Sequence, residues 1–118
     1  MRANKTIKVQ VGSSLRESAD RILADVRRFE RGEDVNENRL VFENWQALFA
    51  LLTPKRYELL AHVHQHPEPS IRALASALGR DFKNVHGDVA ALRDAGLLEC
   101  DEEGVRAEYD RIETAIAL

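Results

Sequence analysis

Lys83, Asn84, His86 and Gly87 form a polar group at the start of a segment whose apolar residues follow helical spacing. Lys side chains bind guanine edges and phosphate, and the Asn side-chain amide pairs with adenine. A glycine inside a helix costs about 1 kcal/mol relative to alanine, so its presence here needs a compensating gain. Close approach of the backbone to a DNA duplex supplies such a gain. We therefore interpret this group as base readers for a major groove.

A helical projection at 100° per residue separates this polar group from the apolar residues of the same segment. The residues expected to point inward are Phe82, Val85, Val89 and Leu92. The opposite face is small and polar, with Lys83, Gly87, Ala90 and Ala91 flanked by Asn84 and His86. The alternative is an ordinary solvated helix end, and Asp88 and Asp94, on or near this face, disfavour contact with a polyanion.

Three predicted helices position the segment, and each begins with a capping signal. The capping residues are Thr53 (followed by Pro54), Ser70 and Asp81. The third helix runs to about Ala95. Gly79 leaves room only for a sharp turn before it, and Gly96 is its natural end. Strand candidates at 97–100 and 105–109 then flank Asp101–Gly104, a pattern typical of a hairpin. This order predicts a winged helix-turn-helix over residues 53–118.

Residues 1–52 are predicted to form a strand–helix–strand extension. Thr6–Val11 alternates between apolar and polar residues, as a half-buried strand does. Ser14 and Glu17 form a capping box for a helix that ends near Arg31. The remaining elements are a loop at 32–38, a strand at Arg39–Phe42, a short buried helix with Trp45, Leu48, Phe49 and Leu52, and a strand (or a helix) at 112–118. The predicted class is α+β, mostly α with a small β component.

Polar and cationic residues around the helix-turn-helix are candidates for phosphate contacts: Lys55, Arg56, Ser70, Arg72 and Arg80. The wing carries one cation, Arg106, behind a tip that reads Asp101-Glu102-Glu103. Because carboxylates are repelled by a duplex, we expect the wing tip not to insert. One such module binds weakly, so we expect a homodimer on a two-fold DNA site. The extension either makes the dimer or partner contact or covers the core.

The net charge of −3 is unevenly distributed. Residues 1–52 carry nine Lys and Arg against eight Asp and Glu, residues 53–93 carry six against four, and residues 94–118 carry two against eight. The middle segment is therefore mildly basic, whatever the charge of the whole chain. The N-terminal residues contain no long apolar run, so we expect neither a signal peptide nor a membrane helix. A single cysteine fits a reducing compartment, and we expect a cytoplasmic, nucleoid-associated protein.

Two other residue patterns have functional interpretations that we do not favour. His62 and His66 share a helix face and suggest zinc, but histidines at a helix end also complement the helix dipole. Cys100 is interpreted as a packed strand residue rather than a redox sensor. The sequence contains no glycine-rich phosphate loop and no nucleophile elbow. We expect no metal, no cofactor and no enzymatic activity.

Residues 53–118 resemble a MarR-like group of prokaryotic winged-helix regulators. The resemblance is carried by LTPKRYELL (Leu52–Leu60), SIRALASALGRDFKNVHGDV (Ser70–Val89), LRDAGLL (Leu92–Leu98) and YDRI (Tyr109–Ile112). It implies a non-enzymatic, sequence-specific regulator of transcription that binds double-stranded DNA, acts as a repressor, and in some members serves as the autoregulating antitoxin of a toxin. The acidic wing tip departs from the group's usual pattern. The alternative is a protein-interaction module that neutralises a toxin or another basic partner without major DNA binding.

Overall fold

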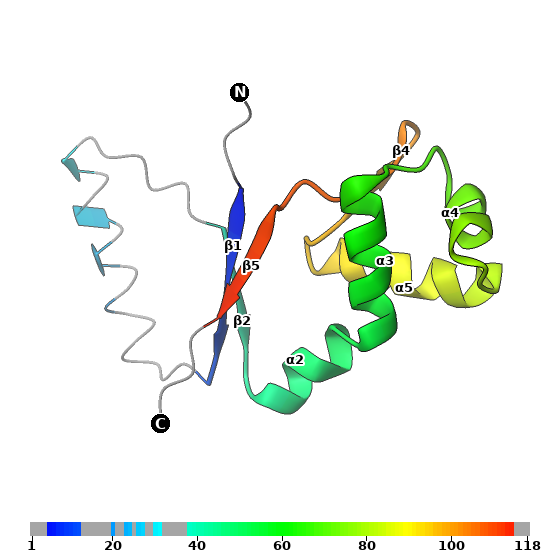
Figure 1. The fold of residues 1–118 in the computed structure, drawn as a ribbon. Coiled ribbons are helices and arrows are strands. Elements are labelled where there is room, and N and C mark those ends of the chain that lie inside the picture. Colours follow the sequence, from blue (N-terminus) through cyan, green and yellow to red (C-terminus); the bar gives the residue numbers. More distant parts are fainter. Residues whose placement is uncertain are drawn as a thin grey trace.

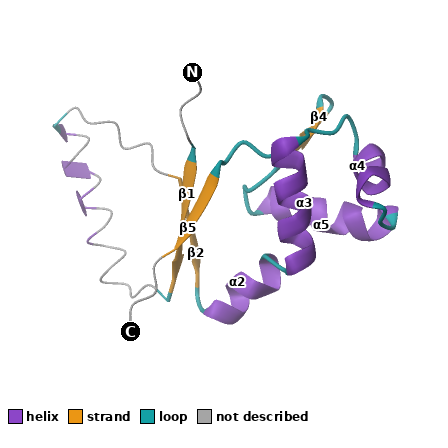
Figure 2. Cartoon of the chain, viewed as in Figure 1, coloured by secondary structure: helices purple, strands orange, loops and turns teal. Residues whose placement is uncertain are grey.

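The computed structural model describes residues 5–12 and 38–114 and, between these ranges, residues 20, 23, 24, 26, 27, 30 and 31. These residues form an α+β fold in which a sheet lies at one end and a group of helices at the other (Figures 1 and 2). Its elements in chain order are β1 (Thr6–Val11), β2 (Asn38–Phe42), α2 (Trp45–Leu51), α3 (Pro54–Gln65), α4 (Ile71–Leu78), α5 (Phe82–Asp94), β3 (Glu99–Asp101), β4 (Gly104–Arg106) and β5 (Arg111–Thr114). The predicted α+β class is confirmed.

The predicted long helix of the extension falls mainly on residues that the structure does not describe. Its capping box, Ser14 and Glu17, and the loop at 32–37 lie outside the described residues. Leu23 and Val26, two described members of its predicted apolar face, are helical and about half exposed. None of the helices within the described ranges has the length and apolar character needed to cross a lipid bilayer.

The three-stranded sheet joins the two ends of the chain. Its strand order is β2-β1-β5, and β1 pairs in parallel with both neighbours. Ile7 and Val9 are buried, which confirms the predicted half-buried strand. β5 confirms the strand interpretation for residues 112–114 of the tail, and residues 115–118 lie outside the described residues. β5 lies beside β1 (Figure 1), with Thr6 in register with Arg111 although the two lie far apart in sequence. The sheet therefore takes strands from both sides of the predicted boundary at residue 52.

The helices α3, α4 and α5 begin where the capping signals placed them. The side-chain oxygens of Thr53, Ser70 and Asp81 accept the backbone N–H groups of Arg56, Ala73 and Asn84 at 3.2, 3.0 and 3.2 Å. Gly79 adopts a left-handed conformation (φ 64°) and makes the sharp turn between α4 and α5. Gly96, also left-handed, follows the end of α5. The local chemistry of the chain therefore accounts for this part of the fold.

One apolar core unites the three helices, the hairpin and the sheet. Its largest fully buried members are Leu59, Leu74, Leu92, Val63, Val85, Val89 and Val105, and Ile7 of β1 belongs to the same cluster. Phe49 and Phe82, both predicted to be buried, are exposed instead. Phe49 is exposed, and its ring contacts Trp45 on the surface of α2 at 5.8 Å between centroids. Phe82 is also exposed, because it stands at the border of the buried face of α5, about 60° around the helix from Val85.

The predicted hairpin consists of β3 and β4, which pair antiparallel with Asp101 opposite Gly104. Glu68 adds an isolated antiparallel bridge to β4, since its backbone exchanges hydrogen bonds of 3.0 and 2.8 Å with Val105. Gly104 was predicted in the turn and instead begins β4, with φ at 124°. A Cβ atom there would collide with the carbonyl oxygen of Glu68 and lie 3.1 Å from Pro69 Cα. This close approach is what requires glycine.

Candidate nucleic-acid interface

The outer face of α5 carries the four predicted base readers, and all four are exposed. Lys83, Asn84, His86 and Gly87 lie opposite the buried residues of the helix, which are Val85, Val89 and Leu92. A Cβ atom on Gly87 would meet nothing within 4 Å. Packing among the described residues therefore does not require this glycine. The predicted orientation of the polar group is confirmed.

One border of this face is formed by a stack of three side chains from α4 and α5. The guanidinium carbon of Arg72 lies 4.6 Å from the centroid of the Phe82 ring. The imidazole of His86 lies 5.9 Å from the same ring, tilted by 49°. Arg72 is exposed, and no hydrogen bond or ion pair of its guanidinium occurs within the described residues. Because the ring contact uses the charge of the guanidinium and not its N–H groups, the donors of Arg72 remain available to phosphate.

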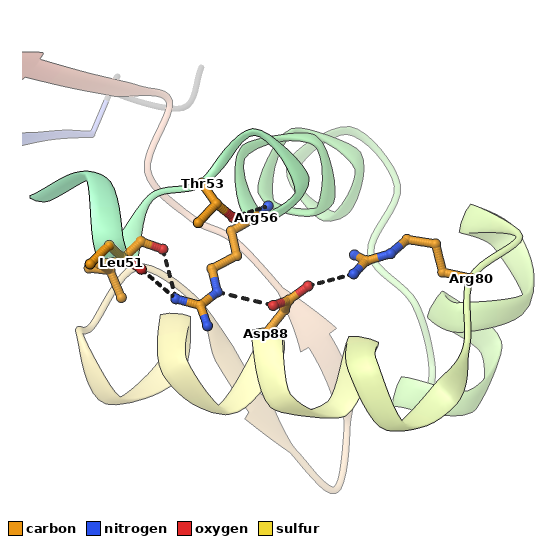
Figure 3. A network of polar contacts seen from close by, with 6 residues as sticks. Leu51, Thr53, Arg56, Arg80 and Asp88 are labelled. Carbon is orange, nitrogen blue, oxygen red and sulfur yellow. Dashed lines mark hydrogen bonds and ion pairs between the residues drawn. The ribbon is translucent and has the colours of Figure 1, made fainter.

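The opposite border is closed by an ion-pair network centred on Asp88 (Figure 3). Its carboxylate accepts hydrogen bonds from Arg56 of α3 at 3.0 Å and from Arg80 of the α4–α5 turn at 2.7 Å. Arg56 also donates to the carbonyl oxygens of Ala50 and Leu51, at 3.1 and 3.0 Å. The side chains of Asp88, Arg80 and Arg56 are 15%, 18% and 23% exposed. The network thus ties α5 to α2, α3 and the turn.

This network changes the expected role of two predicted phosphate ligands. Arg56 and Arg80 direct their charge at Asp88 rather than outward. Lys55, Arg72 and Lys83 are exposed and form no ion pair within the described ranges. Ser70 is exposed, and its hydroxyl is occupied as the cap of α4. The cations available to a polyanion are therefore those on the α3, α4 and α5 surfaces, and not those between the helices.

The predicted wing cation is likewise paired within the protein. Arg106 forms two hydrogen bonds with Asp101, at 3.0 and 2.8 Å, and an ion pair with Glu99 at 2.8 Å. The hydrogen bond from Arg106, with a second from the backbone N–H of Glu103, lowers the pKa of Asp101 from 3.8 to about 2. The same contacts raise the pKa of Arg106. The tip residues Glu102 and Glu103 are exposed, so the hairpin presents net negative charge.

The histidines at the end of α3 have partners within the protein. His62 contacts a carboxylate oxygen of Glu68 at 2.9 Å. His64 contacts the carbonyl oxygen of Ala107 at 2.8 Å and Asp110 at 3.2 Å. In the described part of the chain, no three His, Cys, Asp or Glu side chains gather where they could hold a metal ion. These contacts join α3 to the loop that follows it and to the segment between β4 and β5.

A protein-family model, HVO_A0114, matches residues 51–114, which is more than half of the chain. The chain belongs to the HVO_A0114 family. The part shared with this family runs from the end of α2 to the end of β5 and includes every residue of the candidate interface. No curated protein and no solved structure matches the chain.

Two side chains that border the candidate interface do not stand out in the sequence of this HVO_A0114 family member. The spacing of Phe82 from Val85 and Val89 fits an apolar stripe and predicts a core position. Its place directly after the cap, at the edge of that stripe, is the sequence signal for a position at the border. Asp88 was noted only as an unfavourable charge. Its pairing with Arg56 depends on how α3 crosses α5, which no local pattern reports.

Proposed function

We propose that this protein is a sequence-specific regulator of transcription that binds double-stranded DNA through a winged helix-turn-helix. In this proposal α4 and α5 are the helix-turn-helix, the β3–β4 hairpin is the wing, and residues 53–118 are MarR-like. The observation that carries the proposal is the exposed outer face of α5, where Lys83, Asn84 and Gly87 stand with no apolar cover. A helix with such a face, small and polar at its N-terminal end, suits a major groove.

We assign base contacts and phosphate contacts to different residues, according to which cations are paired within the described part of the protein. Lys83, Asn84 and His86 contact base edges, and Gly87 lets the backbone of α5 approach the duplex. Arg72 and Lys55 contact phosphate, because their charges are not satisfied within the described part of the protein. Regulation takes the form of repression by a homodimer that occupies a two-fold site, since a single module of this size binds weakly.

Electrophoretic mobility of the DNA upstream of the protein's own gene tests this proposal. Lys83→Ala should weaken binding to the preferred site by about 1–3 kcal/mol, or roughly 5- to 150-fold in Kd, and alter site preference. Arg72→Ala should weaken binding to all sequences and flatten the salt slope by about one unit. Arg111→Ala removes the same charge from β5, which belongs to the sheet and not to the helix-turn-helix (Figure 1), and is the matched control. Equal affinities for all four proteins would refute the interface.

Replacing Gly87 by alanine distinguishes an effect on DNA affinity from an effect on stability. Gly87→Ala should stabilise the free protein, by up to about 1 kcal/mol, because the site is helical and open around the added Cβ. The same change should weaken DNA binding, because the methyl group stands between α5 and the duplex. Urea denaturation and mobility shift measure the two effects. Unchanged DNA affinity in the more stable variant would contradict the proposed close approach.

A second proposal is a protein-interaction role, as an antitoxin that binds a basic toxin. It is favoured by the acidic hairpin, where Glu102 and Glu103 are exposed and Arg106 is already neutralised by Asp101 and Glu99. Glu102→Ser/Glu103→Ser leaves the Arg106 pairs intact. This double variant should strengthen DNA binding and weaken capture of the product of the neighbouring gene. Stronger or equal capture would count against the second role.

A further inference from the structure

Phe82 is an apolar side chain left 38% exposed at the first position of α5. Its neighbours on the outer face, Lys83 and Asn84, are polar, so the ring interrupts an otherwise polar surface. Phe82 is not part of the buried core, because the buried residues of α5 begin at Val85. Single exposed apolar side chains are ordinary on protein surfaces. What sets Phe82 apart is that two other exposed side chains hold its ring.

Arg72 and His86 hold the ring of Phe82 from two directions. The Arg72 guanidinium lies over the ring at 4.6 Å, and the His86 ring is tilted against it at 5.9 Å. A ring already fixed in this way loses little further conformational freedom when a ligand contacts its remaining surface. The N–H donors of Arg72 therefore lie next to the same ring. An apolar contact and a phosphate contact are thus presented together.

Among the four DNA bases only thymine presents a methyl group in the major groove, and Phe is one of the side chains that contact it. We propose that Phe82 is a specificity-determining residue that reads the C5-methyl group of a thymine, while Arg72 binds a backbone phosphate nearby. The inference rests on the proposed DNA-binding function and names one base at one edge of its site. It also assigns a role to the exposed ring that Lys83 and Asn84 cannot fill, because they recognise bases by hydrogen bonding.

Replacement of single thymines by deoxyuridine tests the inference, because it removes the methyl group and leaves base pairing unchanged. The probe is the footprinted duplex from the protein's own upstream DNA, with every thymine replaced in turn. For the wild-type protein, at least one replacement should raise Kd about fourfold, the effect of one buried methyl group. Phe82→Ala should bind the unmodified duplex more weakly and lose the penalty at that position. Lys83→Ala, the matched control, should retain the penalty.

Phe82→Leu protects the test against a folding defect, since it keeps an apolar side chain at the same place and should retain part of the penalty. If Phe82 only fastens α5 to α4, then Phe82→Ala would weaken thymine and deoxyuridine duplexes equally and the penalty would persist, which overturns the inference. If the wild-type protein binds the DNA and no deoxyuridine replacement raises its Kd, the inference is wrong but the proposed DNA-binding function stands. Absence of DNA binding would overturn the proposed function together with it.

Discussion

Replacing Asp88 by alanine removes the acceptor that Arg56 and Arg80 share (Figure 3). All three side chains are less than one quarter exposed, so water compensates only in part for the lost bonds. Arg56 keeps the carbonyl oxygens of Ala50 and Leu51. Arg80 keeps no other partner in the described residues, and its Nη1 is already buried without a hydrogen bond. The effect should therefore come mainly from Arg80.

The magnitude follows from these contacts. A hydrogen bond to a charged group contributes about 1.5–3 kcal/mol, and loss of one side of a fully buried ion pair costs about 3–5 kcal/mol. Because the site is partly exposed and Arg56 retains two acceptors, we expect Asp88→Ala to lower the free energy of unfolding by about 2–3 kcal/mol. Asp88→Asn keeps an acceptor oxygen but no charge, and should cost about half as much.

Urea denaturation followed by circular dichroism measures these changes. Asp94→Ala is the matched control, because Asp94 lies on the same helix with its side chain 77% exposed and its closest cation, Arg93, 3.9 Å away. It should change the free energy of unfolding by less than about 0.5 kcal/mol. Double-mutant cycles should give a larger coupling energy for Asp88 with Arg80 than with Arg56. A cost for Asp88→Ala no greater than that for Asp94→Ala would refute the argument.

Two further predictions concern the hairpin. Gly104→Ala should lower the free energy of unfolding by several kcal/mol, because the added Cβ atom collides with the backbone of Glu68 and φ is positive. Gly79→Ala, also at positive φ but in open space, should lower it by only about 1–2 kcal/mol. Equal losses in urea denaturation would contradict the collision. The carboxyl of Asp101 should titrate in an NMR experiment with a pKa of about 2, and Arg106→Gln should return this pKa towards 3.8. Because the folded-state pKa is lowered, the contribution of Asp101 to stability is complete above pH 3.8 and is lost as pH falls through about 2. An unchanged pKa in Arg106→Gln would show that Arg106 is not its cause.

The positions of the helices and of the hairpin followed from local chemistry. Thr53, Ser70 and Asp81 cap helices because their side-chain oxygens satisfy N–H groups that lie three residues away. Gly79 turns the chain because a glycine tolerates positive φ without strain. The exposure of Lys83 and Gly87 followed from helical periodicity, since the buried residues of α5 lie on the opposite side. Each of these features depends on residues within one or two helical turns.

Other features were decided only when distant segments met. The pairing of β5 with β1 joins residues about one hundred positions apart, and Asp88 meets Arg56 because α3 crosses α5. Phe82 lies at the border of the buried face of α5, where Arg72 from another helix contacts its ring. Sequence periodicity predicts which side of a helix is apolar, but it does not predict which side chains of other elements contact the edges of that side. That depends on tertiary packing, which determines that Arg56, Arg80 and Arg106 are paired while Lys55, Arg72 and Lys83 form no ion pair among the described residues.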